Sequence, residues 1–138
     1  MAGYSGTPLA KKLGIDAGAR VALVSAPRGF ATTLDAPKLA KVSTSLGSAA
    51  TYDVIVFFTK EASALRASWK KLVERMDVHG GLWIAWPKKA SGVKTDVTED
   101  AVRADALPRG LVDVKVCAID ATWSGLKLVR RRELRSKK

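Results

Sequence analysis

The sequence has one cysteine, one histidine and no long hydrophobic run in its 138 residues. The single cysteine, Cys117, excludes an internal disulfide framework and is typical of a reducing compartment. One histidine and one cysteine are too few for an ordinary zinc site, so we predict no metal. The densest apolar segment, residues 54–58, has the length of a strand and is far shorter than a membrane span. We therefore expect a cytoplasmic chain with no membrane partner.

Motifs of the common catalytic classes are also missing. No Gly-x-Ser-x-Gly motif occurs, and His79 is expected between a helix and a strand, at the amino end of the sheet. Ligands of α/β proteins bind at the opposite, carboxyl end. Cys117 is expected in mid-strand, where a buried and inert thiol is the usual outcome. The sequence therefore assigns no catalytic residue and weighs against an enzyme without excluding one.

What the sequence has in excess is positive charge. Its 24 lysines and arginines outnumber 13 acidic residues, and the formal net charge is +11. Much of the excess lies in residues 130–138, which we assign to a basic tail after a single α/β domain of residues 1–129. A basic balance favours polyanionic partners such as nucleic acids. The alternative is a tail that only keeps the protein in solution.

Hydrophobic periodicity divides the chain into alternating strands and helices. Strands are predicted where apolar and β-branched residues run together, and helices where apolar residues recur every three or four positions. The predicted helices are residues 7–14, 60–76 and 98–106, capped by Thr7, by Thr59 and by either Asp96 or Thr98. The predicted strands are residues 20–26, 52–58, 82–86, 111–119 and 125–130.

This order predicts a small three-layer α/β fold. Near-continuous apolar strands are typical of a Rossmann-like, mostly parallel sheet that is covered on both faces. The last two strands are joined by a short link and predict a C-terminal antiparallel hairpin. Residues 27–50 carry little signal for a full crossover helix and predict an abbreviated or irregular region, in which residues 41–46 could form a short edge strand. Residues 77–81 predict a turn. Trp69 and Trp83 are expected in the core.

The rest of the chain is organised around a basic loop that follows the strand at residues 82–86. Pro87 ends that strand, and the loop leads into the helix predicted at residues 98–106. Backbone N–H groups at a helix start attract anions, and lysines add positive charge. The loop does not match the Walker motif, so nucleotide hydrolysis is not expected. The alternative is a solvated loop whose lysines bind nothing.

The predicted ligand site combines this loop with side chains expected at the same end of the sheet. In it, lysines supply charge, small polar residues donate hydrogen bonds, and tryptophans form a wall. The loop contributes Lys88, Lys89, Ser91, Gly92, Lys94 and Thr95. Neighbouring segments contribute Ser25, Lys60, Trp86 and Trp123.

The leading interpretation of the sequence alone is a non-catalytic binding or regulatory module. Its ligand would be an anionic small molecule, such as a nucleotide or a phosphorylated metabolite. One alternative is a divergent transferase, and another is a nucleic-acid-binding protein that uses its basic tail. A protein partner or a homo-oligomer formed through the hairpin edge also stays open. The sequence identifies no cofactor.

Two resemblances to known families bear on these alternatives. The strand at 53–58, the helix after it, residues 80–84 and the terminal hairpin resemble the second half of a class I S-adenosylmethionine-dependent methyltransferase. That resemblance implies a glycine-rich loop after the first strand and an acidic, ribose-binding residue at the end of the second. Here residues 25–30 read Ser-Ala-Pro-Arg-Gly-Phe, and no acidic residue ends a second strand.

The second resemblance covers nearly the whole chain. Residues 4–9, 86–92, 98–100, 116–120 and 122–126 resemble a small bacterial family catalogued as domain of unknown function 3052. This resemblance implies no activity, cofactor or site residue.

Overall fold

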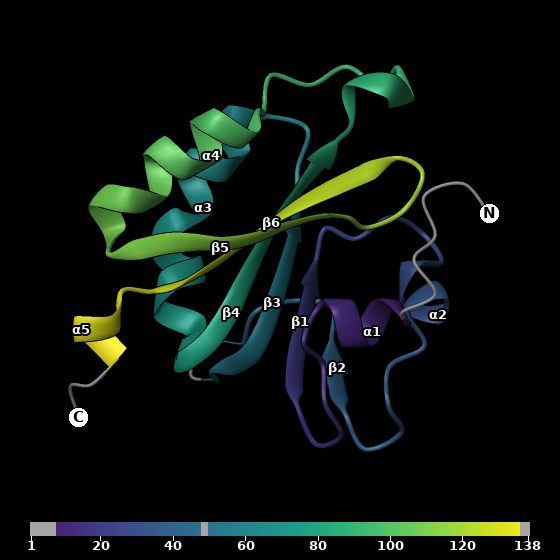
Figure 1. The fold of residues 1–138 in the computed structure, drawn as a ribbon. Coiled ribbons are helices and arrows are strands. Elements are labelled where there is room, and N and C mark those ends of the chain that lie inside the picture. The colour runs from purple at the N-terminus through teal and green to yellow at the C-terminus, as the bar shows by residue number, and fades with distance from the viewer. Residues whose placement is uncertain (1–7, 48–49, 136–138) are drawn as a thin grey trace.

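A computed structural model describes residues 8–47 and 50–135, which form a sheet with helices on both faces (Figure 1). Thr7, one predicted helix cap, lies outside the described residues, as do residues 48–49 of a predicted loop and 136–138 of the predicted tail. The elements in chain order are α1 (Leu9–Lys12), β1 (Arg20–Val24), α2 (Phe30–Leu34), β2 (Lys41–Ser43), β3 (Tyr52–Phe58), α3 (Ala62–Arg75), β4 (Met76–Pro87), η1 (Lys89–Ser91), α4 (Glu99–Ala106), η2 (Leu107–Arg109), β5 (Leu111–Ala118), β6 (Trp123–Arg130) and α5 (Arg132–Arg135).

The six strands form one sheet in the order β2-β1-β3-β4-β6-β5. Strands β1 to β4 are parallel, and β6 runs antiparallel to both β4 and β5. This confirms the predicted α/β class, the mostly parallel sheet and the C-terminal hairpin. The chain leaves β1 for β2 on one side and then crosses to β3 on the other. The gap between the ends of β1 and β3 is therefore the topological switch point, where ligands bind in open α/β sheets.

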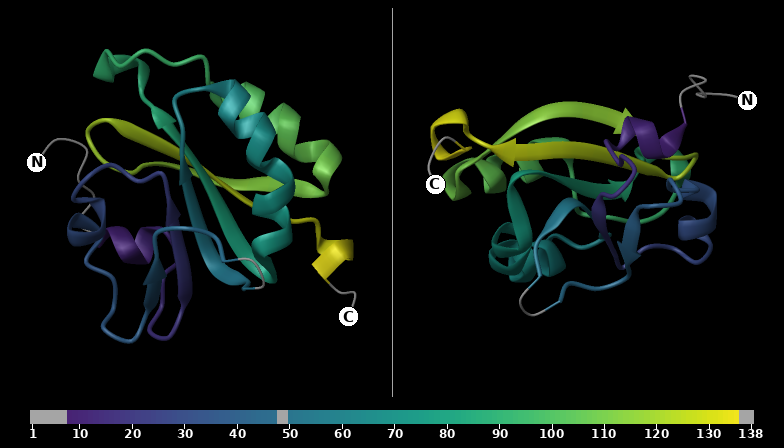
Figure 2. Two further views of the ribbon diagram at one scale, coloured as in Figure 1. Left: turned by 180° about the vertical axis from the view of Figure 1, so that it is seen from behind. Right: turned by 90° about the horizontal axis from the view of Figure 1, so that it is seen from below.

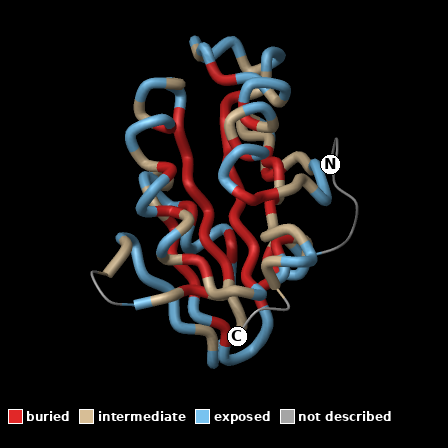
Figure 3. The backbone as a smooth tube through the Cα atoms, turned by 90° about the vertical axis from the view of Figure 1, so that its left-hand side faces the viewer, coloured by how far each residue is buried: buried red, intermediate tan, exposed pale blue. Residues whose placement is uncertain are grey.

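Two apolar clusters lie on opposite faces of the sheet, because successive strand residues point to opposite sides. On one face α3 and α4 bury Trp69 and Val102 against strand residues such as Ile84. On the other, α1 and α2 cover a cluster that includes Trp83. Figure 2 gives two further views of this arrangement, and Figure 3 shows buried strands at the centre with partly exposed segments around them. Trp69 and Trp83 are both fully buried, as predicted.

Strand β4 begins directly at the end of α3, so the turn predicted at residues 77–81 is wrong. Gly80, one of two glycines in this segment, permits close strand pairing. A Cβ on Gly80 would lie 2.9 Å from the backbone oxygen of Tyr52, which only a glycine avoids. The pairing of β3 with β4 is irregular at this point, between Tyr52 and Val54. A glycine pair usually signals a turn, but here it lies within a strand, and Gly80 allows close backbone contact.

The region after β1 is abbreviated, as predicted. It holds only the five-residue α2 and the three-residue β2. Strand β2 pairs parallel with β1 at the edge of the sheet, within the range predicted for an edge strand.

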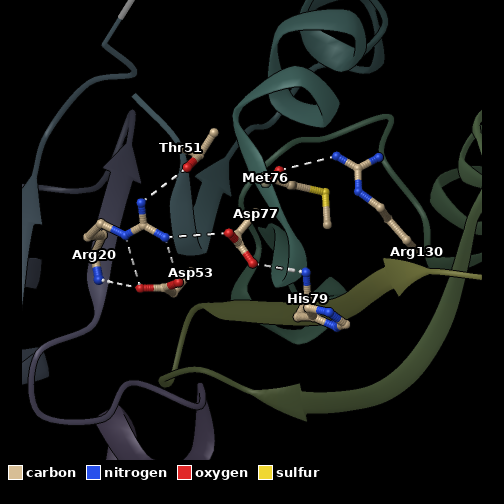
Figure 4. A network of polar contacts seen from close by, with 7 residues as sticks. All are labelled: Arg20, Thr51, Asp53, Met76, Asp77, His79 and Arg130. Carbon is tan, nitrogen blue, oxygen red and sulfur yellow. Dashed lines mark hydrogen bonds and ion pairs between the residues drawn. The ribbon is translucent and has the colours of Figure 1, made fainter. Parts of the chain in front are cut away.

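A cluster of polar contacts around Arg20 fixes the amino edge of the sheet (Figure 4). The Arg20 guanidinium lies 3.0 Å from the Asp53 carboxylate and 3.5 Å from that of Asp77. It thereby links the starts of β1, β3 and β4. The hydrogen bond from Arg20 lowers the pKa of the Asp53 carboxyl below its usual value.

No helix among the described residues is long and apolar enough to cross a bilayer.

Candidate functional site

The carboxyl ends of the parallel strands bring several predicted site residues to one edge. In the strand register, Val24 pairs with Phe57, Phe58 with Ala85, and Pro87 with Trp123. The segments that follow β1, β3 and β4, and the one that precedes β6, therefore meet along this edge. Among the described residues, two separate hollows open there.

The first hollow, which we call the switch-point crevice, lies over the ends of β1, β2 and β3. It consists of two cavities of about 380 Å³ and 350 Å³ that share Ser25 and Thr44 in their linings. The first extends over the start of α2, and the second extends between β3 and α3. Its lining also includes Pro27, Gly29, Phe30, Thr32, Ser45, Leu46, Phe57, Ser68, Lys71 and Leu72.

The chemistry of the crevice is that of hydroxyl groups over an apolar floor. Phe57 and Leu72 provide buried apolar surface. Ser25 and Thr44 are exposed polar residues at its centre. The crevice lining contains one cation, that of Lys71, and no carboxylate. Such a surface suits a ligand with an apolar ring and several hydrogen-bonding groups.

The turn after β1 has a strained backbone at the centre of the crevice. Ser25 has φ 59°, in the left-handed region that residues other than glycine rarely adopt. Gly29, at φ 80°, begins α2 in the same region. Non-glycine residues in this conformation cluster at functional sites, where the surrounding structure holds the strain. The turn occupies the position that a glycine-rich loop has in the methyltransferases that the sequence resembles.

The second hollow, which we call the Trp86 pocket, has a volume of about 660 Å³ and lies between the end of β4 and the start of α4. Of the predicted residues it contains Trp86, Lys89, Gly92, Lys94 and Thr95. Lys88 and Ser91 do not line it.

The small polar residues of the basic loop hydrogen-bond within the chain. Ser91 Oγ donates to the Lys88 carbonyl at 2.6 Å and accepts from Val93 N–H. Thr95 Oγ1 donates to the Lys60 carbonyl at 2.7 Å. The hydroxyl protons that we expected to reach a ligand are thus used to fold the loop, and of its lysines Lys89 and Lys94 line the pocket.

A second set of contacts ties this loop to the start of α3. Asp96 Oδ1 accepts from Ala62 N–H at 2.7 Å, which caps α3 from a distant part of the chain. Helix α3 therefore starts at Ala62 rather than at residue 60, and the hydroxyl of Thr59 accepts from Glu61 N–H instead. Of the two cap candidates for α4, Thr98 is the one that accepts from Ala101 N–H.

The remaining predicted residues lie apart from the Trp86 pocket. Ser25 belongs to the switch-point crevice. The ring of Trp123 packs edge-on against Phe58, with centroids 5.1 Å apart, on the sheet face opposite Trp86. The predicted residues therefore lie in different hollows, and the prediction did not include Thr44, Phe57, Ser68 and Lys71, which line the crevice. The i, i+3 spacing of Ser68 and Lys71 places both on one side of the helix, and this spacing is the sequence pattern that points to the crevice.

The acidic residues of the Trp86 pocket are held by an arginine. Arg103 contacts the carboxylates of Glu99 at 2.6 Å, Asp100 at 3.0 Å and Asp113 at 3.0 Å. Hydrogen bonds to Glu99 and Asp113 raise the pKa of Arg103, and the bond from Arg103 lowers the pKa of Asp113.

Two further observations concern metals and nucleophiles. Within residues 8–47 and 50–135, no group of three or more His, Cys, Asp or Glu side chains could hold a metal ion. Burial raises the pKa of the Cys117 thiol, which disfavours the reactive thiolate.

Comparison with solved structures finds methyltransferases, although no family model and no curated protein sequence matches the chain. A ribosomal protein L11 methylase from Lactobacillus delbrueckii subsp. bulgaricus aligns with a TM-score of 0.63 and 11% identity over 90% of this chain and 75% of that one. An S-adenosylmethionine-dependent methyltransferase from Aquifex aeolicus aligns with a TM-score of 0.62 and 13% identity, over 86% of this chain and 85% of that one. An O-methyltransferase from neocarzinostatin biosynthesis, solved with S-adenosylmethionine, aligns with a TM-score of 0.61 and 14% identity, over 94% of this chain and 51% of that one.

These similarities correct two of our predictions. The interpretation as a non-catalytic binding or regulatory module is contradicted, and so is the leaning against an enzyme, because the neighbours are methyltransferases. The alternative of a divergent transferase agrees better with them. Although the glycine-rich loop is missing, a serine in the left-handed conformation makes the turn after β1. At 11–14% identity the likeness shows a methyltransferase-like Rossmann fold.

Proposed function

We propose that this protein is a divergent transferase with a methyltransferase-like core, and that its donor binds in the switch-point crevice. The observation that carries the proposal is the coincidence of three features: the switch point itself, the crevice over it, and the left-handed turn at Ser25. Ligands of open α/β sheets bind where such a switch occurs. Fold analogy alone would be a weaker argument, because one fold serves many functions.

The residues of the crevice fit the nucleoside part of S-adenosylmethionine. Apolar side chains such as Phe57 and Leu46 would contact the adenine ring, and the hydroxyls of Ser25, Thr44 and Ser45 would bind the ribose. Thr44 follows β2 directly and stands where the resembling enzymes have an acidic residue. Lys71 is the group suited to the donor's carboxylate.

When bound, the donor supplies an electrophilic methyl group. The chain's own contribution would be to position the two reactants and exclude water. In this proposal the Trp86 pocket takes the acceptor, with Trp86 as a wall and Lys89 and Lys94 attracting its anionic groups. The hydrogen bonds of Asp96 and Thr95 hold that pocket beside the start of α3.

The test is a calorimetric titration of S-adenosylmethionine and S-adenosylhomocysteine into the protein and into two variants. Thr44→Asp restores a carboxylate at the end of β2, where it can accept from both ribose hydroxyls. We expect affinity to rise about tenfold, or about 1.4 kcal/mol. Thr33→Asp places the same charge on the exposed face of α2 and serves as the control. Equal behaviour of the two variants, or absence of binding to all three proteins, would reject the proposed donor site.

We also propose that the chain belongs to the family catalogued as domain of unknown function 3052 and that it acts in the cytoplasm. The first rests on the sequence segments that resemble that family. The second rests on a single cysteine, which is free. Imaging of a fluorescent fusion would test the location.

A further inference from the structure

An arginine-rich surface lies at the end of α3 that is away from the switch-point crevice, and the proposed transferase does not explain it. We call it the arginine surface. It brings together residues from the ends of α3, η2 and β6 and from α5: Arg75, Arg109, Arg130, Arg131, Arg132 and Arg135.

Hydrogen bonds tie these segments together. Where α3 ends, Arg130 Nη2 donates to the carbonyl of Val73 at 2.8 Å. It also donates to the carbonyl of Met76 at 3.2 Å (Figure 4). Arg131 N–H donates to the Gly110 carbonyl at 2.9 Å. The start of α5 is thereby joined to the turn that carries Arg109. The segments that carry these arginines therefore form one connected part of the fold.

The positive charge of this surface is poorly balanced. The only ion pair that the described residues make within it joins Arg131 and Glu133, at 3.3 Å. Arg109 and Arg132 are exposed, and the other four arginines are half-buried. An external anion would relieve the repulsion between these arginines.

We infer that the arginine surface binds the phosphodiester backbone of a nucleic acid. The planar fork of a guanidinium matches phosphate geometry bidentately. The six arginines come from four segments, α3, η2, β6 and α5, as suits a chain of phosphates rather than a single one. Helix α5, at four residues, is too short to read a major groove, so the contact is to the backbone.

An anionic membrane is the less favoured partner. Surface-bound helices need an apolar face that enters the lipid. Leu134, the apolar residue of α5, instead packs inward, with its Cδ1 atom 2.7 Å from the position of a Cβ on Gly110. Leu107 lies on η2 and is 45% exposed, but one leucine is a weak anchor.

This inference stands apart from the proposed transferase. The arginine surface lies where α3 ends, towards the amino edge of the sheet, and shares no residue with the switch-point crevice. If both proposals hold, the surface would retain a nucleic acid or its protein complex while the acceptor enters the Trp86 pocket.

The test measures fluorescence anisotropy of a labelled single-stranded RNA oligonucleotide over a range of salt concentrations. The variant Arg132→Ala/Arg135→Ala removes two guanidinium groups, and Arg132→Lys/Arg135→Lys keeps their charge without the fork. The matched control, Lys38→Ala/Lys41→Ala, removes two exposed charges near the opposite edge strand β2. Circular dichroism confirms that each variant is folded.

We expect the double alanine variant to bind at least tenfold more weakly, with the salt slope reduced by about 0.7 for each phosphate that is no longer neutralised. The lysine variant should fall between it and the unchanged protein, and the control should change affinity less than twofold. An equal fall in the control would show that net charge alone acts, and tighter binding to phosphatidylserine vesicles than to RNA would assign the surface to membranes. Either result overturns the inference. Donor titrations of the same variants should be unchanged, so the two proposals fail separately.

Discussion

The capping of α3 by Asp96 offers a precise test of how the carboxyl edge is built. Asp96 Oδ1 accepts from Ala62 N–H at 2.7 Å, across 34 positions of sequence. We expect Asp96→Ala to lower the free energy of unfolding by about 1 kcal/mol, the usual loss for a helix cap. With an unfolding entropy of about 2.1 cal/mol/K per residue, that is a fall in Tm of about 3–4 °C for a chain of this length.

Scanning calorimetry with two comparison variants would check this reasoning. Asp96→Asn keeps an oxygen acceptor and should retain most of the stability, because asparagine caps about as well as aspartate. Asp16→Ala removes an exposed carboxylate that makes no side-chain hydrogen bond among the described residues, and should change Tm by less than about 1 °C. If Asp96→Asn is as destabilised as Asp96→Ala, the cap is not the cause. If neither Asp96 variant changes Tm, the contact between Asp96 and the start of α3 does not stabilise the fold.

Two further predictions concern the sheet. Gly80→Ala should destabilise the protein by about 1–3 kcal/mol in urea unfolding, because its Cβ would meet backbone oxygens of Tyr52 and Asp53 at 2.9 and 3.0 Å. Gly81→Ala meets only the flexible Lys127 side chain and should cost less; the reverse order would contradict the close-contact explanation. The lowered pKa of Asp53 predicts that its bond with Arg20 stabilises the fold above about pH 3.9 and that this stability is lost as the pH falls through the folded-state pKa. The difference in stability between the protein and Arg20→Met should therefore be constant from neutral pH down to about pH 4 and shrink below it, whereas a difference that stays flat to pH 2 would refute this role.

The sequence predicted the layers well because the core strands are almost wholly apolar. The strands at residues 52–58 and 82–86 and the hairpin follow from hydrophobic patterning alone, and so does the burial of Trp69 and Trp83. What patterning missed depends on contacts between distant segments. Asp96 serves α3 instead of α4, and Gly80 permits strand pairing where a glycine pair usually makes a turn.

The candidate site was predicted only in part for a related reason. The lysines near Trp86 are adjacent in sequence and easily recognised as a group. The switch-point crevice draws Ser25, Thr44, Phe57 and Lys71 from four separate segments, and no local pattern unites them. Only the strand order, with β1 between β2 and β3, brings them together.

The measurement that tests the central claim most directly is a titration of S-adenosylhomocysteine into isotope-labelled protein, followed by amide chemical shifts. The account predicts changes that saturate and that centre on Ser25, Thr44, Phe57 and Lys71, with little change around Asp53 at the far edge of the sheet. Changes confined to residues 88–95, or no changes at ligand concentrations that saturate a methyltransferase, would contradict a donor site at the switch point.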